Sequence, residues 1–216
     1  LGMYLLTTDQ DNLASYQDAI GDSEQILSKL KQQISQQNAS EEMMVLKAIE
    51  DQLAQLPKLI EQITAIQGNA EKKFPAYAFF NNEMTPISDQ FQQHISLLIT
   101  EELSQLSPQR RSILEGLMAM QMNWLQATNG VAGYIVFRED FRAAETEQHL
   151  NSIEQGLDTL LTQEDALLSD SQRSQVLQLK DQYEYYRESF MALKRTHQSP
   201  KWRKDTWVMK ARIQPV

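Results

Sequence analysis

Apolar residues recur along most of the chain at alternating intervals of three and four residues. In the first such segment they stand at positions 13, 16, 20, 27, 30 and 34, and a second segment continues the rhythm from 46 to 63. This spacing places the apolar side chains on one stripe of an amphipathic helix, in the register of helical bundles and coiled coils. Pro57 lies inside the second segment and predicts a kink there, because proline removes a helical hydrogen bond.

The same rhythm predicts three further helices, over about 76–106, 108–166 and 171–197, and the start of another after Pro200. Ser107 and Pro108 are typical of a helix start, and no strong stop follows before residue 167. Such a helix would extend roughly 87 Å at about 1.5 Å per residue. It would run without interruption through Gly130 and Gly133, whose small size would allow a close approach of two helices or a slight bend.

Two stretches of the chain repeat each other at an offset of 130 residues. The repeat covers two helices and the turn between them, and it pairs Tyr4 with Tyr134, Ile20 with Leu150, Leu27 with Leu157, Asp51 with Asp181, Gln52 with Gln182, Ile60 with Phe190 and Ile63 with Leu193. Since 130 is not a multiple of seven, helical register alone does not explain the match. Pro75 and Pro200 also correspond, after a shorter loop in the second copy. We interpret the chain as two copies of a helical hairpin, each followed by the start of a third helix.

The repeat predicts an architecture. A lone helical hairpin cannot bury its apolar stripe, so each copy is expected to belong to a four-helix bundle. We predict an all-α fold of two stacked four-helix bundles with antiparallel, up-and-down helices that share the long helix. One module would span 1–133 and the other 134–216. The second bundle would need one more helix, upstream of Leu1, so the first helix of the domain is expected to be truncated at its N-terminus.

Composition agrees with a helical protein and limits its chemistry. The 216 residues include only 7 Gly and 6 Pro, and no Cys, which excludes disulfides and thiol catalysis. No apolar run reaches the roughly 18 residues that indicate a membrane span, and no signal-peptide pattern is present. The net charge of −9 argues against a nucleic-acid partner, although the stretch from Lys180 onward carries nine Lys/Arg against four Asp/Glu.

No motif of an enzyme or of a metal site is found. A di-iron site in a four-helix bundle needs Glu-x-x-His pairs, whereas the residues three positions before the histidines at 94, 149 and 197 are Phe91, Thr146 and Lys194. The sequence also lacks a phosphate-binding loop, a dinucleotide fingerprint, an HExxH motif and a nucleophile elbow. We therefore expect a protein that is not an enzyme and holds neither a cofactor nor a metal.

Two stretches carry a resemblance to a known family. "YLLTTDQDNLASYQDAI" at 4–20 resembles the helix that follows the first membrane span in receptors with a helical bimodular sensor domain, and "YIVFREDFRAAETEQHL" at 134–150 is its counterpart in the second copy. "TPI" at 85–87 and "IQPV" at 213–216 resemble the family's proline turns. This family comprises extracytoplasmic parts of bacterial chemoreceptors (methyl-accepting chemotaxis proteins) and of sensor histidine kinases, including the trimethylamine-oxide type.

The resemblance implies a function. A domain of this family projects into the periplasm between two helices anchored in the inner membrane, works as a homodimer, and binds a small organic acid or similar metabolite between its helices. Binding shifts a helix, and the shift passes to the membrane. On this basis 1–133 would be the membrane-distal module and 134–216 the membrane-proximal one. Two alternatives stay open: a docking module for a periplasmic binding protein, or a purely structural coiled-coil interaction domain.

Candidate ligand-binding residues differ between the two modules. In the proximal module Arg138 and Arg142 have the spacing of one helix face, and the planar guanidinium of arginine suits a carboxylate. The proximal candidates are Arg138, Arg142, Tyr183, Tyr186, Arg187, Trp202 and Arg203. Alternatively, these arginines pair with surface carboxylates such as Glu139, Glu145 or Glu188, and the tyrosines only fill the core.

The distal module offers neutral polar groups instead. Its candidates are Tyr4, Asn12, Tyr16, Tyr77, Asn81, Asn123 and Gln126. A neutral or small ligand would fit these side chains better than a dicarboxylate. Helix caps, surface amides and buried tyrosines with bonded hydroxyls would explain the same residues without a ligand.

Overall fold

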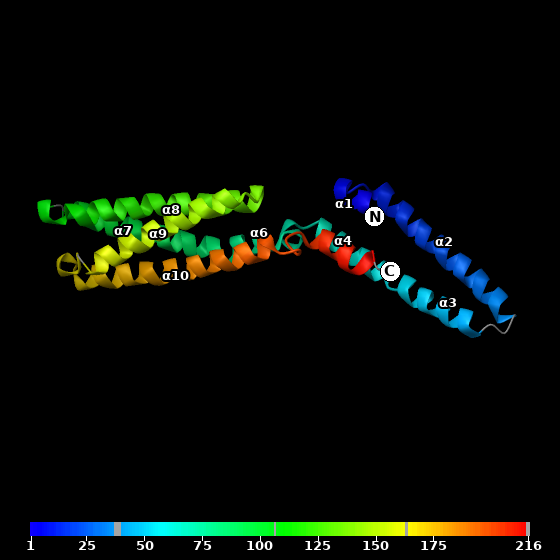
Figure 1. Cartoon of the computed structure of the whole chain (residues 1–216). Coiled ribbons are helices and arrows are strands. Elements are labelled where there is room, and N and C mark those ends of the chain that lie inside the picture. Colours follow the sequence, from blue (N-terminus) through cyan, green and yellow to red (C-terminus); the bar gives the residue numbers. More distant parts are fainter. Residues whose placement is uncertain (37–39, 106, 163, 215–216) are drawn as a thin grey trace. The chain divides into compact units, whose positions relative to one another are not determined.

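The computed structural model describes residues 1–36, 40–105, 107–162 and 164–214, and every regular element in these ranges is a helix (Figure 1). The expected all-α class is therefore confirmed. The chain divides into two compact units. Unit 1 comprises Leu1–Pro75 and Pro200–Val216, and unit 2 comprises Ala76–Ser199. Each unit is described on its own below.

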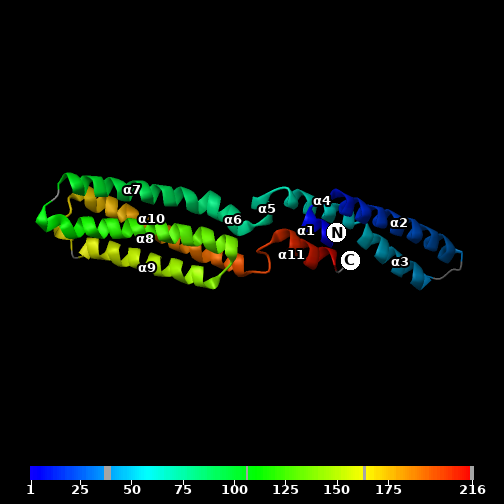
Figure 2. The same cartoon turned by 90° about the horizontal axis from the view of Figure 1, so that it is seen from above.

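Unit 2 is a bundle of four long helices. Its elements are α6 (Pro75–Phe79), the π-helix η1 (Phe80–Met84), α7 (Thr85–Ser104), the 3-10 helix η2 (Pro108–Arg110), α8 (Arg111–Phe137), α9 (Asp140–Thr162), the 3-10 helix η3 (Asp165–Leu167) and α10 (Asp170–Gln198). The helices contact one another in a closed ring, in the order α7, α8, α9, α10 and back to α7. Figures 1 and 2 show the four helices lying side by side along their length.

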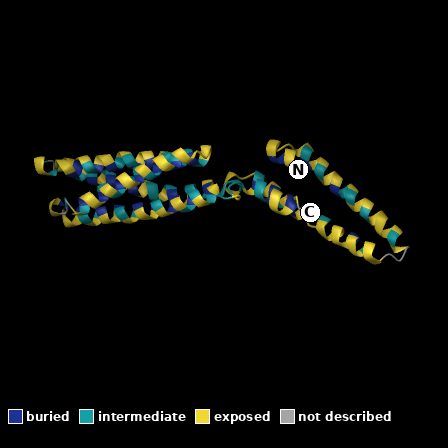
Figure 3. Ribbon diagram, in the orientation of Figure 1, coloured by how far each residue is buried: buried dark blue, intermediate teal, exposed yellow. Residues whose placement is uncertain are grey.

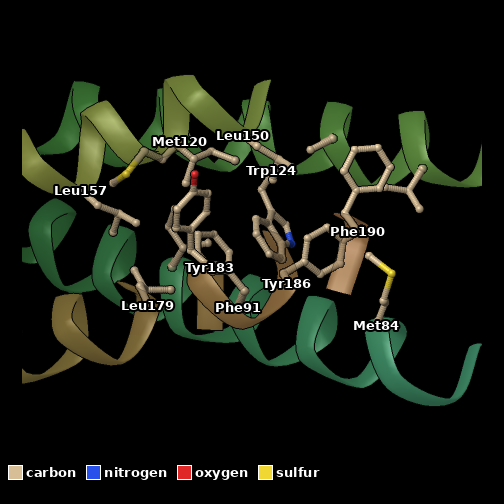
Figure 4. Close-up of a cluster of buried hydrophobic side chains, with 14 of the residues drawn as sticks. Met84, Phe91, Met120, Trp124, Leu150, Leu157, Leu179, Tyr183, Tyr186 and Phe190 are labelled. Carbon is tan, nitrogen blue, oxygen red and sulfur yellow. The ribbon is translucent and has the colours of Figure 1, made fainter. Parts of the chain in front are cut away.

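Large aromatic side chains fill the core of unit 2 (Figure 4). Trp124 of α8 stacks on Phe91 of α7 with 3.8 Å between ring centroids, and Tyr186 of α10 lies tilted against the indole at 4.7 Å. The indole nitrogen donates a hydrogen bond to Ser88 Oγ at 3.2 Å. Burying aromatic surface of this size is a main stabilising term for a helical bundle.

The predicted long helix is wrong, although helix through the two glycines is confirmed. α8 continues through Gly130 and Gly133 but ends at Phe137, where Arg138 adopts the left-handed conformation with φ 57°. The chain then reverses, and α9 packs back along α8. Gly130 lies where α8 and α9 approach each other, so its small size serves contact within this hairpin.

The expected module boundaries, 1–133 and 134–216, do not coincide with the two compact units. Because α9 folds back on α8, residues on both sides of position 133 share one core. The chain passes from unit 1 to unit 2 at Pro75 and returns at Pro200. These two prolines correspond in the repeat. α6 begins at Pro75 itself, whereas its counterpart α11 begins after Pro200, at Lys204.

Unit 1 is a helical hairpin with short additional elements. They are α1 (Gly2–Thr7), α2 (Gln10–Ser35), α3 (Ser40–Leu53), α4 (Leu56–Gln67), α5 (Ala70–Lys73), α11 (Lys204–Val208) and the π-helix η4 (Met209–Ile213). The second helix, for which a kink at Pro57 was expected, is instead divided in two, since α3 stops before Pro57, which lies in the first turn of α4. α11 and η4 pack against α4, and α1 packs against the start of α2.

The repeat is visible in the elements of the two units. α2 and the α3–α4 pair of unit 1 correspond to α9 and α10 of unit 2. The π-helices η1 and η4 correspond as well, and each follows an α-helix of five residues. α1 ends at Thr8 in the left-handed conformation that also ends α8 at Arg138. By this correspondence α1 repeats the last turns of α8.

Candidate functional site

The arginines predicted for the proximal site already have protein partners in unit 2. Arg138 ends α8, so it does not share a helix face with Arg142, and its Nη2 donates a hydrogen bond to the backbone oxygen of His197 at 3.0 Å. Arg142 pairs with Glu139 at 2.7 Å and lies over the ring of Phe137. Both arginines therefore have partners within the protein, and the pairing of Arg142 with Glu139 is one that the surface-pairing alternative named.

Arg187 and the two tyrosines of α10 are likewise occupied. Arg187 Nη1 donates to Glu154 at 2.6 Å and to the hydroxyl of Tyr183 at 3.1 Å. Tyr183 and Tyr186 are buried in the aromatic core, and burial raises the pKa of both hydroxyls, that of Tyr183 to about 12. Their hydroxyls thus stay neutral at physiological pH.

Trp202 and Arg203 lie in unit 1, so the seven proximal candidates are divided between the two units. Arg203 belongs to a buried polar network around Asp205, whose side chain is fully buried. Arg203 Nε lies 2.9 Å from Asp205 Oδ1, and Lys73 Nζ lies 3.6 Å from Oδ2. Arg203 also donates to the backbone oxygen of Leu5. This network joins α1, α5 and α11, and we did not predict Asp205 from the sequence, where it is one carboxylate in a basic stretch.

The distal candidates are also divided between the units. Unit 1 holds Tyr4, Asn12 and Tyr16, and unit 2 holds Tyr77, Asn81, Asn123 and Gln126. Tyr4 is part of the buried core of unit 1, Asn12 donates to Asp9 at the start of α2, and burial raises the pKa of the half-buried Tyr16. These side chains therefore have structural roles in unit 1.

In unit 2 the neutral candidates do not converge on one point. Asn123 Oδ1 lies 2.9 Å from His149 Nδ1 across the α8–α9 contact, while its Nδ2 donates to the backbone oxygen of Ala119. Gln126 is exposed on α8, and Tyr77 is 40% exposed on α6. Asn81 lies in the π-helix η1.

The feature that distinguishes the two units is the burial of the repeated apolar stripe. In α9 the stripe positions 143, 146, 150, 153, 157 and 160 are all buried, whereas in α2 only two of the six counterparts, Leu13 and Ile20, are buried. Leu30 is 40% exposed and its counterpart Leu160 is 2% exposed. The same apolar pattern is thus covered in unit 2 and open in unit 1.

The second helix of each hairpin shows the same contrast. Ile49 of α3 is 39% exposed, whereas its counterpart Leu179 of α10 is fully buried. Figure 3 shows α3 mostly in the colour of exposed residues. In unit 2 the hairpin α9–α10 is covered by α7 and α8. In unit 1 the described residues supply only the short helices α1, α5, α11 and η4 for the same purpose.

The open side of unit 1 forms two adjoining grooves. One lies between α2 and α4, has a volume of about 500 Å³, and is lined by Leu13, Gln17, Ile20, Gly21, Glu24, Pro57, Ile60, Glu61 and Thr64. The other, of about 470 Å³, continues between α2 and α3, where Lys31 pairs with Glu50 at 2.7 Å. We regard these grooves as the candidate functional site.

The charges along this site decide what it can accept. The floor of the α2–α4 groove is apolar, and the charged side chains lining it, Glu24 and Glu61, are both acidic. A carboxylate ligand would be repelled there, whereas an apolar helix face or a neutral or cationic molecule would not. Among the described residues, no group of His, Asp or Glu side chains is placed to hold a metal ion.

The sequence predicted that the stripe residues of this site share one helix face, but it predicted that they are buried in a core. What separates the two copies is which further helices share a unit with each hairpin, and the apolar pattern of the hairpin does not contain this information. No family model matches the chain, and neither a curated protein nor a solved structure matches it. The fold therefore defines the class: an all-α protein of two units built on a repeated hairpin. Within the described part of the chain, no helix has the length and apolar content needed to cross a membrane.

Proposed function

We propose that this chain is the extracytoplasmic sensing region of a bacterial transmembrane receptor, and that unit 1 is the part nearest the membrane. The observation that carries the proposal is the apolar stripe of α2–α4, which stays open where its repeat in unit 2 is covered. The segments of unit 1 from the two ends of the chain also pack together, since Tyr4 and Leu5 share a core with Val208 and Ile213.

In this proposal two further helices complete unit 1. The helix that continues α1 on its N-terminal side takes the place that α8 has in unit 2, because α1 repeats the last turns of α8. The helix that continues η4 takes the place of α7, because η1 leads directly into α7. Both helices are the segments that would lead to the membrane. The unit next to the membrane is then unit 1, the reverse of the assignment expected from the sequence.

Cysteine labelling tests this arrangement, since the chain has no native cysteine. Ile49→Cys places a thiol on the open face of α3, and Lys47→Cys places one on the exposed opposite side of the same helix as a control. In the isolated chain a maleimide should label both variants. In the protein with its flanking segments, labelling at position 49 should become slow while labelling at 47 stays fast. Equal labelling at position 49 in both proteins would contradict the proposal.

Ligand sensing follows from the same arrangement. A small molecule that binds between the helices of unit 1 and favours one arrangement of them would shift the helices that lead to the membrane. The acidic groove favours a neutral or cationic molecule over the organic acid expected from the resemblance. A thermal-shift screen of amines, neutral metabolites and organic acids tests this preference. An amine or a neutral metabolite should raise the melting temperature of the chain, because a ligand that binds only the folded state raises stability.

The open grooves favour one second candidate, a docking module for another protein such as a periplasmic binding protein. Their apolar floor extends along both α2–α4 and α2–α3, which suits a helix of a partner. In that case the small-molecule screen gives no shift, and Ile49→Cys is protected only when the partner protein is added.

A further inference from the structure

α8 has an outer face without charge. From Gly116 to Phe137 no residue is charged, although 23% of the chain is Asp, Glu, Lys or Arg. α9, which packs against α8, carries charged side chains along its whole length. The inner stripe of α8 needs apolar residues for the core of unit 2, but the core does not require an uncharged outer face. This outer face is therefore unexplained by the fold of unit 2.

The outer face has its own regular pattern, which we call the outer seam. It consists of Met118, Met122, Leu125, Asn129, Ala132 and Val136, at alternating intervals of four and three residues. Met122 is 57% exposed, Leu125 is 41% exposed and Val136 is 71% exposed. The buried inner stripe at 113, 117, 120, 124, 127, 131 and 134 is separate from it. α8 thus has two seams of coiled-coil spacing, one used inside unit 2 and one facing outward.

We propose that a second copy of this chain packs its α8 against the outer seam, parallel and in register. The seam is uncharged, and so are the flanking positions Ala119, Gln121, Gln126 and Thr128, so two copies bring no like charges together in a chain of net charge −9. The single polar residue of the seam, Asn129, then lies opposite its own copy. An asparagine at such a position pairs with itself in parallel two-stranded coiled coils and fixes their register.

The size of the contact predicts a dissociable dimer. Met118 to Val136 extends about 27 Å along the helix. A contact of that length buries roughly 1,000 Å² in total, which is the low end of the range for specific interfaces. Association should therefore depend on concentration, and flanking segments that hold two copies together would strengthen it. This inference names the surface of the expected homodimer and does not depend on a ligand.

Sedimentation velocity over a wide range of concentrations tests the proposal with the chain as it is. The wild-type chain should pass reversibly from monomer to dimer. Leu125→Lys should remain monomeric throughout, because it buries two charges at the seam. Leu177→Lys makes the same change at an exposed leucine of α10, 48% exposed, and should dimerise like the wild type. A wild-type chain that stays monomeric, or a Leu125→Lys variant that dimerises equally well, would overturn the proposal.

Disulfide formation tests the orientation. Met118→Cys lies at one end of the seam, so it can form a disulfide with its own copy only if the two helices are parallel and in register. Gln155→Cys, exposed on α9, is the control for random collision. Oxidation should link Met118→Cys many times faster than Gln155→Cys. Equal rates would overturn the parallel arrangement, even if the Leu125→Lys variant is monomeric.

Discussion

Gly130 of α8 and Thr146 of α9 approach so closely that a Cβ atom on Gly130 would lie 2.3 Å from Thr146 Oγ1. The hydroxyl of Thr146 is held in place because it donates to the backbone oxygen of Arg142 at 2.8 Å, and Thr146 is fully buried. Glycine inside a helix is otherwise unfavourable by about 1 kcal/mol relative to alanine. The close contact of the two helices explains why glycine is present.

Gly130→Ala should therefore destabilise unit 2 by about 1–2 kcal/mol, because the overpacking outweighs the gain in helix propensity. In a Thr146→Ala background the same substitution should instead stabilise by up to about 1 kcal/mol, since the hydroxyl is gone. Gly133→Ala is the control: the nearest atom to its Cβ is the end of the Arg142 side chain at 3.1 Å, which can move. Chemical denaturation measures all three, and destabilisation of equal size in both backgrounds would contradict this explanation.

A buried ion pair at the opposite end of unit 2 should be a strong contributor to its stability. Glu102 is 1% exposed and pairs with Arg110, and Gln172 Nε2 donates to Glu102 Oε1 at 2.7 Å. The hydrogen bond to Glu102 raises the pKa of Arg110. Arg110→Met should cost about 3–5 kcal/mol, because it leaves the carboxylate buried without a counter-charge.

The neighbouring arginine provides a matched control for this experiment. Arg111 pairs with Glu115 at 2.7 Å on the surface, with side chains 76% and 63% exposed. Arg111→Met should change the free energy of unfolding by about 0.5 kcal/mol or less. The double variant Arg110→Met with Glu102→Leu should recover much of the loss of Arg110→Met alone. Similar effects of the two single arginine substitutions would disprove the role assigned to the buried pair.

The stability of unit 2 should fall in mild acid because of His197. Burial lowers the pKa of His197 from its ordinary value of 6.5, and the charge of Arg138 lowers it further, against the opposing effect of a hydrogen bond with the backbone of Tyr134. As pH falls below 6.5, His197 takes up a proton in the unfolded chain before it does so in the folded chain. The free energy of unfolding therefore decreases as the pH falls from 6.5 to the folded-state pKa of His197. His197→Gln should flatten this part of the pH dependence measured by denaturation. A parallel pH dependence in the wild type and His197→Gln would exclude His197 as the cause.

Unit 1 should depend on the network around Asp205. Asp205→Asn should destabilise unit 1 by about 2–4 kcal/mol, because Arg203 and Lys73 lose the buried carboxylate that they share. Asp51→Asn, an exposed position on α3, should have an effect within about 0.5 kcal/mol. Amide hydrogen exchange followed by mass spectrometry resolves the two units. Faster exchange in both units after Asp205→Asn would show that the network is not confined to unit 1.

Local pattern predicted the helices and the repeat, but not the point at which the chain reverses. The turn after α8 contains only Arg138 and Glu139, and neither is a glycine or a proline that would indicate a turn. The first copy carried the clearer signal, because Thr8 is followed by Asp9, whose side chain caps α2. In the repeat Thr8 and Asp9 correspond to Arg138 and Glu139. The signal in the first copy therefore also indicates the residue at which α8 ends.

The candidate site was missed for a different reason. Periodicity places Ile49 and Leu179 on equivalent stripes, but it does not say whether another helix covers them. That depends on which helices share a unit, and hence on contacts between distant parts of the sequence. Arg138 and Arg142 were selected by residue type and helical spacing, and the partner of Arg187, Glu154, became identifiable only from the packing of α9 against α10.

Residues 76–199 interrupt unit 1 between α5 and α11. Since η1 packs against α10, the chain enters and leaves unit 2 at the same end of that bundle. Folding of unit 2 therefore brings the two separated segments of unit 1 together and removes most of the entropy lost in closing a long loop. Unit 2 can fold as soon as it is synthesised, and α11 and η4, which follow it in the chain, then dock on α4 at a lower entropic cost. Unit 2 would then serve as an intramolecular template for completing the unit that contains both ends of the chain.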